Sequence, residues 1–120
     1  MQVAQDNDGV TAHFADGTSA AGDILVIDSS HIAVAGSDVD LPLNLVLPQL
    51  TPGVLVHLHD IFLPDAYPAS WAWRGYNEQV AVAPLLHGGG WAIRLASHYL
   101  TTRHADRLGV ELAGLPVHRP

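Results

Sequence analysis

The sequence predicts an α/β fold in which parallel strands alternate with helices, in the order strand–helix–strand–helix–strand. Two short apolar runs carry this prediction, residues 24–27 and 54–59, because β-branched, leucine-rich runs of this length are typical of buried parallel strands. The segment between them is long enough for the helical crossover that parallel strands require. We expect residues 1–21 to form an N-terminal β-hairpin segment and residues 22–120 to form the α/β part.

The N-terminal β-structure and the first helix follow from local signals. Turn-forming residues at 6–9 and 16–17 separate short strand-like runs. Ser37 and Asp40 have the spacing of a helix N-terminal capping box. The residues after them place an apolar stripe on one helical face: Val39, Leu43, Val46, Leu47 and Leu50. Pro42 and Pro48 lie near the two ends of this helix, where proline limits its regularity.

The sequence signals for the remaining helices and strands are less regular. Ser70 caps a second helix that extends to about residue 86, interrupted by Gly75 and Pro84. Alternating apolar residues over 91–97 indicate a third strand, and a short helix is expected around 103–113. Both crossover helices are expected on one face of the sheet. The strands are apolar on both faces, so we expect either that the chain is a fragment or that the other face is covered by the N-terminal segment or by a partner chain, as in a homo-oligomer.

Composition excludes several classes of function. The chain has 120 residues, 5 basic and 12 acidic side chains and a formal charge of −7, which disfavours nucleic acid and anionic membranes as partners. It contains no cysteine and no apolar run of the ~20 residues that would span a bilayer. Its first residues lack the features of a signal peptide. We expect a soluble cytoplasmic protein that acts on a small-molecule substrate.

Residues able to bind a metal ion follow both predicted strands. Asp28 and His31 come after the first strand, and His59 and Asp60 end the second. Ligands of open α/β sheets bind beyond the carboxyl ends of the strands, so these side chains define a candidate site. The carboxylates suit Mg²⁺ or Mn²⁺, and His59 favours Mn²⁺, Fe²⁺ or Zn²⁺. His57 points to the same face as His59, and we expect it in the core or behind the ligands.

His31 is a candidate general base, since a neutral imidazole at the mouth of the site takes a proton from a substrate hydroxyl. The alternative interpretation is that Asp28 caps a turn and His31 is a solvated loop residue. Arg74, Asn77 and Glu78 lie three or four residues apart, so they either reach one substrate pocket or face water.

Residues 22–100 resemble the C-terminal half of class I S-adenosylmethionine-dependent methyltransferases, which have a Rossmann-like fold. The stretches that carry the resemblance are GDILVIDSSH at 22–31, GSDV at 36–39, LPQLTPGVLVHLHDIFLP at 47–64 and WRGYNEQ at 73–79. The Asp-x-x-His sequence after one strand and the polar pair after the next are similar to those of metal-dependent sugar O-methyltransferases.

The resemblance implies that Asp28 and Asp60 bind a divalent metal, with His59 in place of an acidic residue, and that His31 is the base. It also implies S-adenosylmethionine as the cofactor. The Gly-rich turn and acidic residue that bind this cofactor in the family are absent from the sequence. We therefore expect a partial Rossmann-like methyltransferase domain, a fragment with little activity alone.

A second, shorter resemblance covers residues 9–26, GVTAHFADGTSAAGDILV, which are similar to a β-segment of flavin-dependent aromatic monooxygenases. Three hypotheses follow from the sequence. The first is a fragment of an O-methyltransferase acting on a small hydroxylated molecule. The alternatives are a non-catalytic interaction or oligomerisation module and a flavin-associated fragment.

Overall fold

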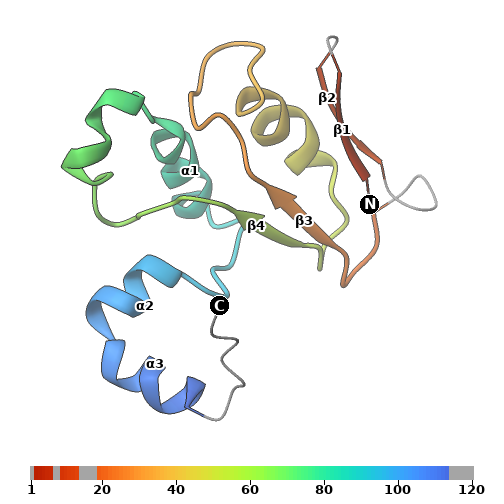
Figure 1. Cartoon of the computed structure of the whole chain (residues 1–120). Helices are drawn as coiled ribbons and strands as arrows, with labels where there is room; N and C mark the ends of the chain where they lie inside the picture. Colours follow the sequence, from red (N-terminus) through yellow and green to blue (C-terminus); the bar gives the residue numbers. More distant parts are fainter. Residues whose placement is uncertain (1, 7–8, 14–18, 114–120) are drawn as a thin grey trace.

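The computed structural model describes residues 2–6, 9–13 and 19–113 as a small mixed α/β protein (Figure 1). Its strands form two separate two-stranded sheets, β1 with β2 and β3 with β4. The strands are β1 (Gln2–Asp6), β2 (Gly9–His13), β3 (Ile24–Ile27) and β4 (Leu55–Leu58). The helical segments are η1 (Pro42–Val46), η2 (Leu47–Gln49), η3 (Ala69–Arg74), α1 (Glu78–His87), α2 (Ser97–Arg103) and α3 (Ala105–Leu112).

The N-terminal hairpin confirms the expected β-structure at the start of the chain. Strands β1 and β2 pair antiparallel, with Gln2 opposite His13 and Asp6 opposite Gly9. The predicted turn at residues 16–17 lies outside the described residues. Because this hairpin is not hydrogen-bonded to β3 or β4, it does not extend the sheet that carries the candidate site.

Strands β3 and β4 are parallel neighbours, as the two apolar runs predict. Ile24 pairs with Leu55 and Ile27 with Leu58, so the two strands finish side by side. Side chains alternate across a strand, and β3 accordingly buries Leu25 and Ile27 while Val26 is 53% exposed. In the described part of the chain, Ile24, Val26 and Leu55 on the opposite face of the sheet are about half exposed, and cover of this face by a partner chain stays a prediction.

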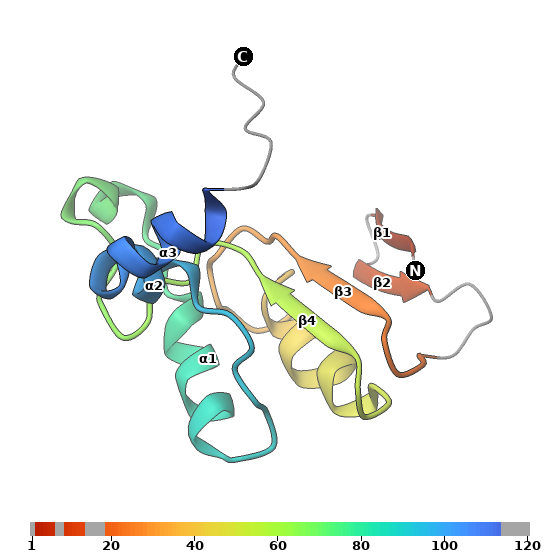
Figure 2. The same cartoon turned by 90° about the horizontal axis from the view of Figure 1, so that it is seen from below.

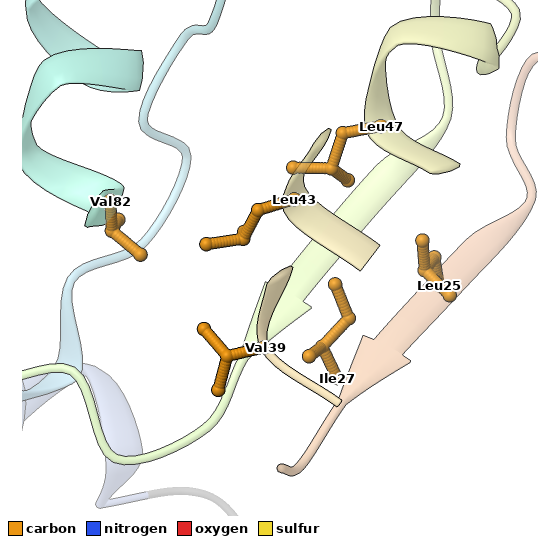
Figure 3. Packing of buried hydrophobic residues seen from close by; sticks show 6 residues of the cluster. All are labelled: Leu25, Ile27, Val39, Leu43, Leu47 and Val82. Carbon is orange, nitrogen blue, oxygen red and sulfur yellow. The ribbon is translucent and has the colours of Figure 1, made fainter. Parts of the chain in front are cut away.

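The core lies between the sheet and the helices on one of its faces, where η1, η2 and α1 pack together (Figure 2). Figure 3 shows six buried apolar side chains of this core, Leu25, Ile27, Val39, Leu43, Leu47 and Val82. Val39, Leu43 and Leu47 are buried at intervals of four residues, which confirms the predicted apolar stripe.

The cap of this first helical segment is formed as its sequence predicts. The Ser37 hydroxyl oxygen accepts hydrogen bonds from the backbone N–H groups of Val39 and Asp40, and the Asp40 carboxylate accepts one from Gly36. Beyond the cap, the chain forms a π-helical turn from Pro42 and then a 3-10 turn through Pro48. Pro42 is the first residue of the π-helical turn and Pro48 the second residue of the 3-10 turn, positions where a missing N–H costs little.

Two predicted elements are corrected by the structure. The expected helix over 70–86 is divided into η3 and α1, because Gly75 adopts a left-handed conformation with φ of 68° that ends the first segment. The predicted strand over 91–97 is wrong: residues 91–96 form no strand, and α2 begins at Ser97. The alternating apolar residues of this segment do not form the buried face of a strand, since Ile93 is 63% exposed and Leu95 is 73% exposed.

Helix α2 is anchored to the loop after β4 through Asp65. The Asp65 carboxylate accepts hydrogen bonds of 2.5 and 2.6 Å from the Arg103 guanidinium and contacts His98 Nε2 at 2.8 Å. These bonds, from Arg103 above all, lower the pKa of Asp65 to about 2. The short helix expected around 103–113 corresponds to α3. Within the described residues, no helix is long and apolar enough to cross a membrane.

Candidate functional site

The carboxyl ends of β3 and β4 form a rim that brings together side chains from both strands. The His59 N–H donates to the Ile27 carbonyl at 2.9 Å, which continues the parallel ladder by one residue. Asp28, His31 and His59 each offer a ligand atom here, and these atoms all lie within 4.8 Å of one another. The sequence therefore predicted correctly which residues the two strand ends bring together.

The distances within the rim leave room for a small group or ion. Asp28 Oδ1 lies 3.5 Å from His59 Nδ1 and 3.7 Å from His31 Nε2. Asp60 approaches both imidazoles, at 3.3 Å from His59 Nδ1 and 3.8 Å from His31 Nε2. The side chains of Asp28 and His59 are at least half exposed, whereas His31 is buried. The rim is thus open to solvent over a buried imidazole.

His31 is held by its backbone as well as by its ring. Its φ is 59°, in the left-handed region that residues other than glycine seldom adopt. The His31 carbonyl accepts hydrogen bonds from the backbone N–H groups of Asn77 and Glu78, and its own N–H donates to Ser29 Oγ. The Tyr76 ring packs against the imidazole, with ring centroids 4.6 Å apart. His31 is therefore a fixed interior residue, which rules out the interpretation that it is solvated.

The partner of the His31 ring is a buried carboxylate. Glu78 is 1% exposed, and its Oε2 lies 2.7 Å from His31 Nδ1 and accepts a hydrogen bond from the Ser29 hydroxyl. An ionised carboxylate only accepts hydrogen bonds, so a proton on Nδ1 would complete this contact. The other ring nitrogen, Nε2, faces the carboxylates of Asp28 and Asp60 at the rim. Ser29 donates to Glu78 and not to Nε2, so it is not arranged as a nucleophile.

The three residues predicted to bind substrate have different surroundings. Glu78 contacts His31, as described above. The Asn77 side chain bonds the backbone of Ala33, accepting from its N–H at 2.6 Å. Arg74 lies over the rings of Trp71, Trp73 and Tyr76, 4.6 to 5.4 Å from their centroids. A role in substrate binding stays a prediction for these three residues.

An aromatic layer lies beside the rim and contains residues that sequence reasoning did not assign to the site. Phe62, Tyr67, Trp71 and Tyr76 pack with ring centroids 5.2 to 5.9 Å apart. Burial raises the pKa of the Tyr67 hydroxyl, and the nearby charges of Glu78 and Asp60 raise it further. Tyr67 is therefore a neutral phenol at physiological pH.

Three other findings correct or extend the predictions made from the sequence. His57 is exposed on the open face of the sheet, so the expectation that it is a core residue is wrong. Ser29 and Gln79 were missed, although the run of polar residues 77–79 at the start of a helix is a signal that could have identified Gln79. The contact between His31 and Glu78 joins residues 47 positions apart and depends on tertiary structure.

The donor set of the rim suits a first-row transition ion. Two imidazoles and carboxylate oxygens are a mixed nitrogen and oxygen set, which binds Mn²⁺, Fe²⁺ or Zn²⁺ in preference to Mg²⁺. No protein-family model, curated protein sequence or solved structure matches this chain. Its function is therefore inferred from its own residues.

Proposed function

We propose that this chain is the acceptor-side half of a class I S-adenosylmethionine-dependent O-methyltransferase that acts on a small hydroxylated molecule. His31 is the general base in this proposal. One observation carries it: the buried His31 ring is bound through Nδ1 to Glu78, and its Nε2 faces the rim formed by Asp28 and Asp60. The resemblance of residues 22–100 to this family adds to the support.

The proposed chemistry needs a hydroxyl that loses its proton as its oxygen is methylated. His31 Nε2 accepts that proton, and the ring becomes a cation while Glu78 remains bound to Nδ1. The negative charge of Glu78 stabilises this cation at its buried position. The cofactor supplies the methyl group when bound. The sequence contains no Gly-rich turn for it, so we assign it no binding residues in this chain.

A divalent ion is part of the proposal, and we favour Mn²⁺ because of the imidazole ligand. Asp28, His59 and Asp60 would hold it, and the ion would lower the pKa of an acceptor hydroxyl. Asp28 and His59 also belong to the group with ligand atoms within 4.8 Å of one another. His31 belongs to that group too. We propose that its Nε2 accepts the proton of the substrate hydroxyl and that Asp60 is the third metal ligand.

The experiment that tests this proposal measures unfolding of the chain in urea with and without Mn²⁺. At a free ion concentration about 100 times Kd, binding to the folded state adds about 2.7 kcal/mol to the free energy of unfolding. We expect this gain in the wild type and in His31→Gln, and its loss in Asp28→Ala and His59→Gln. His57→Gln is the matched control, because His57 is two residues from His59 and exposed on the open face.

Each result of this experiment has one meaning for the site. A wild type that gains no stability from Mn²⁺, or a gain that survives Asp28→Ala, contradicts the metal site. Loss of the gain in His31→Gln makes His31 a ligand and contradicts its role as the base. Calorimetric titration with S-adenosylmethionine tests the second part, since we expect no micromolar binding by these residues alone.

A second candidate function is a non-catalytic interaction module, and the open face of the sheet favours it. Ile24 is 58% exposed, Val26 53% and Leu55 46%, which is unusual for apolar residues of a parallel sheet. This candidate predicts self-association that is insensitive to metal and is weakened by Val26→Asp. Sedimentation of the chain with and without Mn²⁺ distinguishes the two candidates. The flavin-associated hypothesis predicts a yellow purified protein.

A further inference from the structure

The start of helix α1 ties together the loops on both sides of the rim. Three consecutive polar residues, Asn77, Glu78 and Gln79, form hydrogen bonds with three different parts of the chain. Asn77 bonds the backbone of Ala33, in the loop after β3. Gln79 accepts from the Phe62 N–H at 3.1 Å and donates to the carbonyl of Asp65 at 3.0 Å, both in the loop after β4. Glu78 lies between these two attachments and contacts His31.

This arrangement fixes Glu78 relative to the imidazole from two directions. The backbone N–H groups at positions 77 and 78 donate to the His31 carbonyl at 2.9 and 3.2 Å, while the Glu78 carboxylate contacts the ring. The ring therefore cannot turn away without breaking contacts with the same helix start. Among the described residues, Ser29 and His31 are the groups that bond the Glu78 side chain.

The chemistry of Glu78 argues against a purely structural role. A buried carboxylate is costly unless its oxygens are hydrogen-bonded, and an apolar side chain of similar size would fill the same space at less cost. Glu78 Oε2 accepts from the Ser29 hydroxyl and lies 2.7 Å from His31 Nδ1, whereas the buried Oε1 has no hydrogen-bond partner among the described residues. Both contacts of the carboxylate are thus made by one oxygen, and the shorter of them is the contact with His31 Nδ1.

We propose that Glu78 is the positioning residue of His31, which keeps the ring proton on Nδ1 and leaves Nε2 free toward the rim. The use of this free nitrogen as the base rests on the proposed function. The position of the proton does not, because it is a property of the chain without metal or substrate. Glu78 then acts through His31 and does not contact the acceptor, unlike the substrate-binding role expected from its sequence.

The test is nitrogen NMR of the histidine side chains in the metal-free chain at alkaline pH, where two-bond couplings show which ring nitrogen carries the proton. In the wild type we expect the His31 proton on Nδ1. Glu78→Met removes the acceptor and should shift the proton away from Nδ1. Glu78→Gln should retain it, because the amide oxygen can replace Oε2 as the acceptor. Gln79→Met is the matched control at the adjacent buried position.

The outcomes separate this proposal from the proposed function. An unchanged His31 tautomer in Glu78→Met, or an equal change in Gln79→Met, overturns the positioning role. If Glu78→Met does not fold, the wild type decides the matter, since a proton on Nε2 overturns the proposal without any variant. A chain that binds no Mn²⁺ but shows the expected tautomers contradicts the metal site and leaves the positioning role supported.

Discussion

Replacing Leu25 tests which face of the β3–β4 sheet is covered, because its neighbour on the strand points to the opposite face. Leu25 is 2% exposed, whereas Val26 is 53% exposed. Leu25→Ala removes three buried carbons at about 0.8 kcal/mol each, and the cavity left behind raises the loss in free energy of unfolding to about 3 kcal/mol or more. Val26→Ala removes two half-covered carbons, so its loss should be about 0.8 kcal/mol.

Urea unfolding followed by tryptophan fluorescence measures both variants against the wild type. The expected loss for Leu25→Ala is a large part of the stability of a small domain, and its midpoint should fall far below that of Val26→Ala. Equal losses in the two variants would contradict the one-sided core, because they would mean that a second layer covers Val26. A loss of less than about 1 kcal/mol for Leu25→Ala would contradict its place in the core.

Three further predictions concern the loops that hold the rim. Asp65→Asn should lower stability at neutral pH, because the hydrogen bonds from Arg103 and His98 favour the ionised Asp65 carboxylate and lower its pKa from 3.8 to about 2. The difference from the wild type should vanish as the pH falls from 3.8 toward about 2, and a constant difference contradicts this. Gly53→Ala should cost more than about 1 kcal/mol in urea unfolding, since its φ is +97° and the new Cβ would lie 2.9 Å from the Ala21 Cβ. Gly22→Ala, with φ of +94° and open space, should cost less, and equal losses contradict the contact. Asn77→Ala should cost about 1 kcal/mol in the same assay and Asn77→Asp less, because Asp keeps the acceptor; equal losses contradict the importance of that bond.

The parts of the fold that depend on local pattern could be predicted from the sequence. Residues 24–27 and 54–59 have the length and composition of buried parallel strands, and the adjacency of their ends follows from parallel pairing. The sequence alone therefore places Asp28, His31 and His59 near one another. The cap at Ser37 was equally predictable, because its hydrogen bonds involve residues next to it in the chain.

The parts that depend on tertiary contacts could not be predicted. Alternation over 91–97 indicates an extended chain but does not provide a partner strand, and the residues there remain exposed. His57 is exposed because the helices pack on the other face of the sheet. The sequence of β4 does not indicate which of its two faces the helices cover. The buried contact of Glu78 with His31 requires α1 to begin beside the rim, and local spacing contains no information about that.

The paramagnetic effect of Mn²⁺ on the histidine NMR signals tests the central claim most directly, namely that the ends of β3 and β4 form one metal site. At substoichiometric Mn²⁺, the signals of His31 and His59 should broaden first. His87 lies at the far end of α1, about 13 Å along the helix from Glu78, and should change little. Asp28→Ala should abolish the selective broadening. Broadening of all histidines alike, or of none, would contradict the claim.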